Sequence, residues 1–269
     1  MKKYASRIYL CIIFAILYIP ILTLILFSFN SSESTANFAG FSFEWYIKLF
    51  SDEAAFIALR NTLILAVCSA VLSTVIGTAA AEGIYRMRSK WFKTVVTSVT
   101  NVPMMNPDIV TGISMMLLFV FVGTLLGLSE MLSFWTMLIA HVTFNIPYVI
   151  LSVMPKLRQM DKHLPEAAMD LGCTPLQAFF KVELHAILPG IITGGVMAFT
   201  LSLDDFVISY FTAGSSFQTL PLMIYSMTKK EVTPDMYALS TIIIVTVLLL
   251  LILSNLLGEK SEKNGKGAK

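Results

Sequence analysis

Charged residues are scarce in this chain. Asp, Glu, Lys and Arg make up 13% of its 269 residues, whereas hydrophobic residues make up 56%. So few charges could not hydrate the surface of a soluble domain, and the mean hydropathy of +0.77 excludes that class. Cysteine is also sparse: Cys11, Cys68 and Cys173 lie far apart, in no disulfide or metal-binding spacing. We therefore expect an all-α polytopic membrane protein with no metal and no cofactor.

A nucleotide-binding loop is also absent. No Gly-x-x-x-x-Gly-Lys-Ser/Thr sequence occurs, and that motif is what cradles ATP phosphates in a P-loop. The chain is therefore predicted not to be an enzyme, and any ATP hydrolysis would belong to a separate subunit. The net charge of +2 follows from the distribution of Lys and Arg between loops, so it indicates no nucleic-acid partner.

Six apolar runs are long enough to cross a bilayer, whose hydrocarbon core of about 30 Å takes roughly 20 helical residues. With both termini in the cytoplasm, 15 of the 19 Lys and Arg residues lie inside, as the positive-inside rule requires. We therefore expect a multi-pass protein of the cytoplasmic (inner) membrane. A cleaved signal peptide is the alternative for the first run, but that run is longer than an h-region and lacks a cleavage pattern. The runs are residues 8–29, 61–85, 94–122, 132–154, 187–212 and 236–258.

The runs suggest three segments. Residues 1–60 hold the first span and an amphipathic outer segment, in which Trp45, Tyr46, Leu49 and Phe50 suit the membrane interface. That segment could also help to receive a substrate-carrying protein. Residues 61–258 form a core of five spans with a cytoplasmic loop at about 156–188. Residues 259–269 form a basic tail that is expected to be disordered and cytoplasmic.

The third span contains two prolines four residues apart, Pro103 and Pro107, with Asn101, Asn106 and Asp108 around them. Each proline removes an amide donor and disfavours helix in the preceding residue, so the helix is predicted to kink or break here. Broken helices within a membrane persist only where protein or a water-filled cavity satisfies the backbone. This span is therefore expected to face the bundle interior.

Three carboxylates fall at similar depth if the third and fifth spans are straight helices: Asp108, Asp204 and Asp205. Because an unpaired charge in the bilayer is costly, we predict that they line a substrate pathway, with Phe206 and Tyr210 as aromatic faces for a cation. The alternative is that one of them caps a broken helix or pairs with a basic residue.

Three further polar positions in the spans are predicted to be structural. His141 and Asn145 of the fourth span are expected to be hydrogen-bonded bundle residues and not ligands. Glu82 should form an i,i+4 ion pair with Arg86.

Residues 164–190 form a polar, helix-patterned island between two apolar runs. Pro165 suits a first helical position and Gly172 suits a left-handed helix end, while Thr174-Pro175-Leu176-Gln177 is a capping box. A second helix should run to about Leu184. This island is expected to dock on a soluble partner through the charges of Glu166, Asp170, Lys181 and Glu183 and through a small-residue face of Ala167 and Ala168.

The sequence Glu166-Ala167-Ala168-x-x-x-Gly172 resembles the EAA loop of binding-protein-dependent ABC transporter permeases. This resemblance implies a type I importer (MetI-like) permease fold. It also implies that Glu166, Ala167, Ala168, Asp170 and Gly172 dock on an ATP-binding cassette ATPase dimer. A second permease subunit and an extracytoplasmic binding protein would complete the transporter. The family's proline after the loop is replaced here by His185, which leaves the hinge into the fifth span open.

Other stretches resemble the polyamine branch of that family, which moves spermidine and putrescine. They are Tyr18-Ile19-Pro20-Ile21 with Ser28-Phe29-Asn30-Ser31-Ser32, then Asn106-Pro107-Asp108-Ile109-Val110, and Phe199-Thr200-Leu201-Ser202-Leu203-Asp204-Asp205. Negative groups along a path are what a polycationic chain needs to replace its hydration. Import of another solute, such as an iron chelate or an aminoalkylphosphonate, is the first alternative. A stand-alone secondary transporter is the second, although no inverted repeat is evident.

Overall fold

A computed structural model of the chain describes residues 2–32, 37–128, 131–161, 163–215, 217–229, 235–246, 248–249 and 252. Within those ranges the regular structure is helical, apart from one isolated bridge between Asn30 and Phe41. The predicted all-α class is therefore confirmed. The predicted tail at 259–269 lies outside the described residues, and so do most residues of the sixth predicted span beyond 246.

Five of the described helices are long and apolar enough to cross a membrane, and a shorter apolar helix covers the start of the sixth predicted span. The third predicted span is divided, so that only its second part, after the prolines, is among the five. The five are Arg7–Phe27, Glu53–Arg86, Asp108–Leu126, Phe134–Gln159 and Pro175–Asp204, and the shorter helix is Asp235–Thr246.

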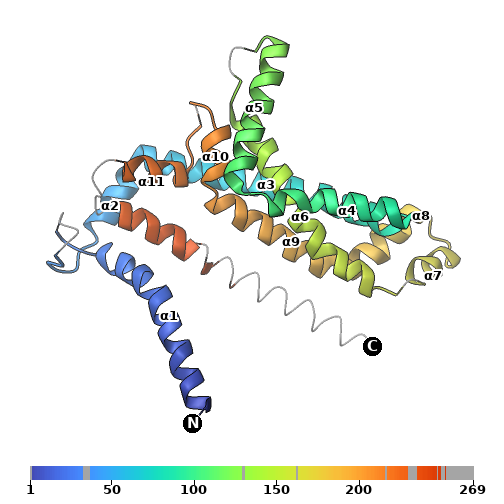
Figure 1. Cartoon of the computed structure of the whole chain (residues 1–269), viewed down its shortest axis with the longest axis horizontal. Coiled ribbons are helices and arrows are strands. Elements are labelled where there is room, and N and C mark those ends of the chain that lie inside the picture. The colour runs from blue at the N-terminus through green and yellow to red at the C-terminus, as the bar shows by residue number, and fades with distance from the viewer. Residues whose placement is uncertain are drawn as a thin grey trace. The chain divides into compact units, whose positions relative to one another are not determined.

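The chain forms two compact units, which Figure 1 shows as parts of one helical chain. Met1–Arg60 and Leu220–Leu248 make up the first unit, and the second is centred on Asn61–Thr219. The first unit contains α1 (Lys2–Phe27), α2 (Glu44–Ser51), the start of α3 (Glu53–Arg86), α11 (Leu220–Thr228) and the helix Asp235–Thr246. The second contains the rest of α3, α4 (Lys90–Met105), α5 (Asp108–Leu126), α6 (Phe134–Gln159), α7 (Leu164–Asp170), α8 (Pro175–Ala178), the π-helical turn η1 (Phe179–Glu183), α9 (Leu184–Asp204) and α10 (Val207–Thr212).

The core of the first unit forms around α2, which is amphipathic as predicted. Trp45 and Leu49 are buried, whereas Ile47 and Phe50 are largely exposed. The indole Nε1 of Trp45 donates a hydrogen bond of 2.6 Å to the carbonyl oxygen of Asn30, which fixes α2 to the turn after α1. The predicted interfacial segment thus buries one apolar face and leaves the other open.

The core of the second unit is the contact between α6 and α9, which lie side by side (Figure 1). A Cβ at Gly190 of α9 would lie 2.8 Å from the backbone oxygen of Ser152, so only glycine permits this approach. On the α3 side, a Cβ at Gly77 would lie 2.7 Å from that of Val149. Small residues at such crossings let helix backbones pack closely where no hydrophobic effect drives association in lipid.

Candidate functional site

The third predicted span breaks where the prolines predicted. Helix α4 ends at Met105, Asn106 and Pro107 adopt extended backbone angles, and α5 begins at Asp108. The side chain of Asn106 donates a hydrogen bond of 3.2 Å to Thr111 in the first turns of α5, which holds the two half-helices at a fixed junction. Asp108 is therefore the first residue of a helix and is exposed.

The fifth predicted span is also broken, so the condition of straight helices, under which the depths of the carboxylates were compared, does not hold. Helix α9 ends at Asp204, Asp205 is extended (φ −65°, ψ 123°), and α10 starts at Val207. The Asp205 carboxylate accepts hydrogen bonds from the backbone N–H groups of Ile208 (3.3 Å) and Ser209 (2.8 Å). A carboxylate in this position supplies acceptors that a preceding helical turn would have supplied, so the second helix can start afresh.

His141 joins the same cluster. Its Nε2 lies 3.1 Å from Ser209 Oγ and 3.4 Å from Asp205 Oδ2, and its side chain is fully buried. The prediction that His141 is a hydrogen-bonded bundle residue is confirmed. The structure also matches the alternative stated for one of the carboxylates, because Asp205 caps the broken helix. Its neighbour Asp204 is exposed.

The starts of α5 and α10 lie at one level. A Cβ at Gly112, one turn after Asp108, would lie 2.8 Å from the Phe211 ring and 3.4 Å from the Val207 carbonyl oxygen. The structure thus brings together the two breaks that carry the predicted pathway carboxylates. The Phe206 and Tyr210 rings lie beside them, with centroids 5.6 Å apart, and Tyr210 is half-exposed.

A buried polar cluster between α3, α6 and α9 was only partly foreseen. Asn145 Nδ2 lies 2.8 Å from Ser69 Oγ and 2.7 Å from Ser202 Oγ, and the two serine oxygens are 2.8 Å apart. Asn145 was predicted to be hydrogen-bonded, which is confirmed, but its serine partners were not named. Serine is common in membrane helices, so no local signal separates Ser69 and Ser202 from the others.

The island after α6 folds as its capping residues predict. Gly172 has φ +91°, its N–H donates to the Met169 carbonyl, and the Cys173 N–H donates to the Ala168 carbonyl, which together form a Schellman end for α7. The predicted capping box is present at the start of α8: the Thr174 side chain accepts from Gln177 N–H, and the Gln177 side chain accepts from Thr174 N–H.

The exposure of the docking residues divides them into two groups. Ala168 is buried, so it supports the loop and cannot belong to an exposed small-residue face as predicted. The side chain of Glu166 lies 3.1 Å from His163 Nδ1 at the surface. The remaining predicted docking residues are exposed with it: Ala167, Asp170 and Gly172.

Glu183 corrects a second expectation about the island. It was assigned to the docking charges, but it is buried, and both of its carboxylate oxygens accept hydrogen bonds of 2.8 Å from an Arg86 guanidinium nitrogen. Arg86 also pairs with Glu82, which confirms the i,i+4 ion pair. Glu183 therefore ties the island to the end of α3.

The second island helix continues into α9. α8 passes into the π-helical turn η1, and the helix then runs without a break to Asp204. The hinge left open by His185 is therefore absent: that residue lies on the continuous helix and is exposed. Insertion of a π-helical turn rotates the following helix relative to α8 without ending it.

The described residues contain no group of three or more His, Cys, Asp or Glu side chains that could hold a metal ion. They combine carboxylates at two helix breaks, aromatic rings and a capped surface loop. Interrupted membrane spans joined to such a loop are the features of a membrane-spanning transport subunit. Residues 73–264 match the family described as binding-protein-dependent transport system inner membrane component, and the chain belongs to that family.

Relatives of known sequence agree with this family. The chain is 40% identical over 255 residues to the spermidine/putrescine transport system permease protein PotC of Escherichia coli K12, with 95% of this chain and 94% of the relative covered. It is 39% identical over 260 residues to PotC of Haemophilus influenzae, covering 97% and 98%. It is 40% identical over 238 residues to the putrescine transport system permease protein PotI of Escherichia coli K12, covering 87% and 83%.

Solved structures agree on the fold. A bacterial ABC transporter involved in the import of the acidic polysaccharide alginate superposes with a TM-score of 0.74 at 17% identity, covering 96% of this chain and 95% of that one. The MetNI methionine ABC transporter, in an inward-facing conformation, superposes with a TM-score of 0.63 at 19% identity, covering 78% and 99%. The predicted ABC importer permease fold is confirmed.

Proposed function

We propose that this chain is the permease subunit of an ATP-binding cassette importer for polyamines in the cytoplasmic membrane, with both termini in the cytoplasm. The observation that carries the proposal is the 40% identity to a spermidine/putrescine permease across 95% of the chain. ATP hydrolysis takes place on a separate ATPase dimer. A second permease subunit and an extracytoplasmic polyamine-binding protein complete the complex.

The island carries the coupling in this proposal. Its exposed residues, among them Glu166 and Asp170, contact the ATPase. Closure of the ATPase then moves α7 and α8. Because α8 is continuous with α9, the movement reaches the break at Asp204. Glu183 and Arg86 pass it to α3 through their 2.8 Å hydrogen bonds. Two conformations of the bundle, biased by the ATPase, then present the path to each side in turn.

The substrate path in this proposal runs along the two breaks. Asp108 and Asp204 are exposed carboxylates that attract ammonium groups, and Phe206 and Tyr210 offer aromatic faces. Asp205 contributes negative charge beside them but is already held by His141 and by α10. Few and weak contacts suit transport, because a cation bound too tightly would not leave.

The test is ATP-driven spermidine uptake into proteoliposomes that contain the whole complex. Excess putrescine or spermidine should compete with uptake, whereas an iron chelate or an aminoalkylphosphonate should not. Asp108→Asn should lower uptake at least tenfold while the complex still assembles. Glu53→Gln, which removes an exposed carboxylate at the start of α3, is the matched control and should transport normally. Competition by another solute class, or uptake driven by an ion gradient without ATP, would overturn the proposal.

A further inference from the structure

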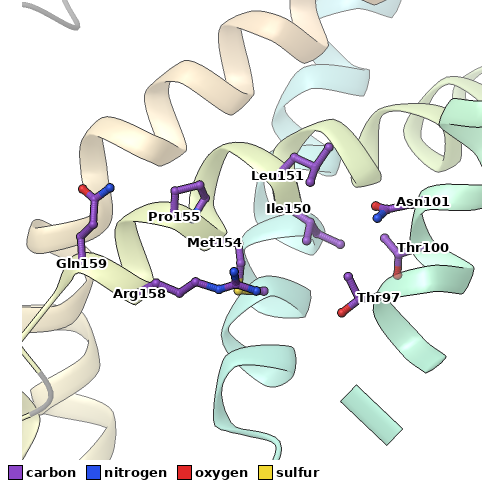
Figure 2. Close-up of a pocket in the computed structure, with 9 residues that line it drawn as sticks. All are labelled: Thr97, Thr100, Asn101, Ile150, Leu151, Met154, Pro155, Arg158 and Gln159. Carbon is purple, nitrogen blue, oxygen red and sulfur yellow. The ribbon is translucent and has the colours of Figure 1, made fainter. Parts of the chain in front are cut away.

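Two adjoining cavities of about 310 and 400 Å³ open along α4, the larger one over its first turns and the other between α4 and α6. They share Thr97 and Arg158 in their linings. Figure 2 shows Arg158 on α6 extended toward the α4 side, where Thr97, Thr100 and Asn101 lie. The proposed substrate path and the proposed docking residues contribute no side chain to either lining.

The charge of these cavities is positive. Lys90, Lys93 and Arg158 line them, and no Asp or Glu is among the lining residues. Lys93 is partly engaged, since its Nζ donates to the Tyr85 carbonyl at 3.0 Å. Within the part of the chain that the structure describes, the Arg158 guanidinium has no hydrogen bond or ion pair. The N-terminal end of α4, which opens at Ser89, adds further partial positive charge.

Such a cavity repels a polyamine and attracts an anion. The hydroxyls of Thr97 and Ser98 lie beside the cations and offer further donors. A guanidinium, ammonium groups and hydroxyls together are the donor set that phosphate oxygens accept from. The shared chemistry of the ligand is therefore a phosphate group.

The cavity between α4 and α6 favours a phosphate that carries an acyl chain. Four α6 residues of its lining are apolar, Ile150, Leu151, Met154 and Pro155, and they precede the polar Arg158 and Gln159 on the same helix. In the first turn of α4, where Lys90 also lies, Trp91 is 75% exposed and Phe92 is 50% exposed, and α4 contains no buried residue. Aromatic side chains at this position suit the level of lipid headgroups. Cationic residues and apolar residues in adjoining linings match a phospholipid better than a free ion.

We propose that the cavities between α4 and α6 bind the phosphate headgroup of an anionic phospholipid, with Arg158 and Lys90 as its main charge partners. The lipid belongs to the leaflet that faces the Lys- and Arg-rich loops, which is the cytoplasmic leaflet in the proposed orientation. There it supplies packing that α4 lacks and holds the first half of the broken span against α6.

The first experiment measures binding of phosphatidylglycerol to the purified complex by native mass spectrometry. Arg158→Gln should weaken binding about fivefold, and adding Lys90→Gln should weaken it about fivefold again, because each basic group near an anionic surface contributes a factor of that size. Arg88→Gln is the matched control, since Arg88 is an exposed cation in the same loop outside the cavity linings. An equal loss with Arg88→Gln would mean general surface attraction and would overturn the proposal.

The second experiment uses the unmodified complex, so it does not depend on the folding of variants. Hydrogen exchange of residues 90–101 is measured in phosphatidylcholine nanodiscs with and without phosphatidylglycerol, and in phosphatidylcholine nanodiscs with inorganic phosphate. Exchange should slow several-fold only with phosphatidylglycerol. Equal slowing with inorganic phosphate would make the ligand a free anion, and no slowing in either case would remove the site; both results overturn the proposal. Neither readout involves polyamine uptake, so failure here leaves the proposed function untouched.

Discussion

Adjacent acidic residues at the end of α9 serve different purposes. Asp205 accepts two backbone hydrogen bonds from α10 and lies 3.4 Å from His141, whereas Asp204 is exposed. One carboxylate is therefore part of the scaffold, and the other is available to a ligand. The two adjacent carboxylates thus differ in their surroundings: Asp205 caps a helix and Asp204 is exposed.

The two aspartates should respond differently to removal of their charge. Asp205→Ala removes the cap of α10 and should lower the free energy of unfolding by about 0.5–2 kcal/mol, the usual cost of losing an N-cap. Asp204→Asn should leave stability unchanged but lower spermidine uptake. Thermal unfolding of the purified complex and proteoliposome uptake separate the two effects. The assignment fails if Asp204→Asn unfolds earlier than Asp205→Ala.

Glu183 was predicted to be a docking charge, but it is buried and bonded to Arg86. Its buried carboxylate holds Arg86, so Glu183→Gln should weaken charge-assisted bonds and lower stability by about 1.5–3 kcal/mol. Lys181→Gln changes an exposed charge two residues earlier and should have no such effect. The check is the thermal unfolding midpoint of the complex for each variant, and equal midpoints would contradict the assignment.

At the scale of elements, the contact between α6 and α9 forms the core of the second unit. The two backbones approach so closely at Gly190 that a side chain there would have no space. Glycine is not required by packing at every position. A Cβ at Gly83 of α3 would meet nothing within 4 Å. The structural value of a glycine in this protein thus depends on its neighbour.

That difference gives a matched pair of substitutions. Gly190→Ala should destabilise the protein by about 1–3 kcal/mol, because the new methyl group would press on the Ser152 carbonyl oxygen and on Lys156. Gly83→Ala should be neutral or stabilise by about 0.5–1 kcal/mol, since alanine favours a helix over glycine. Chemical or thermal unfolding in detergent measures both. Equal destabilisation by the two changes would refute the packing argument.

At the scale of the whole molecule, the second half of the island and α9 form one continuous helix. α7 ends in a Schellman turn, α8 begins in a capping box, and α8 then continues through η1 into α9. In the proposed coupling, a movement of α8 would act along this helix of 30 residues, which ends at the break beside Asp204. Such an arrangement suits transmission from a surface partner to the membrane interior.

Disruption of the island should abolish the stimulation of ATP hydrolysis by substrate. Glu166→Lys combined with Gly172→Pro reverses an exposed charge and removes the left-handed helix end, so substrate-stimulated ATP hydrolysis should fall at least tenfold. Glu53→Lys reverses an exposed charge at the start of α3, and a complex that contains this variant should show normal substrate-stimulated ATP hydrolysis. Undiminished hydrolysis by the double variant in proteoliposomes would remove the coupling role.

Local signals were sufficient for one of the two span breaks and for the helix ends of the island. The break at Pro107, the left-handed Gly172 and the capping box at Thr174 each depend on residues within about five positions, and all were predictable. The break at Asp205 was not, because no proline precedes it and its cap becomes evident only in the fold.

The sequence by itself determined the membrane class and the helix ends near Pro107, Gly172 and Thr174, because these follow from hydrophobic runs and from bonds between near neighbours. The family was identified by the resemblance of its motifs to those of known permeases. Only the tertiary structure decided that Glu183 meets Arg86, 97 residues away, and that Ala168 is buried. It also decided that Asn145 lies between Ser69 and Ser202. The physical reason is that a buried polar side chain bonds to whichever partner the helix packing brings to it, and helix packing is set by shape across the whole bundle.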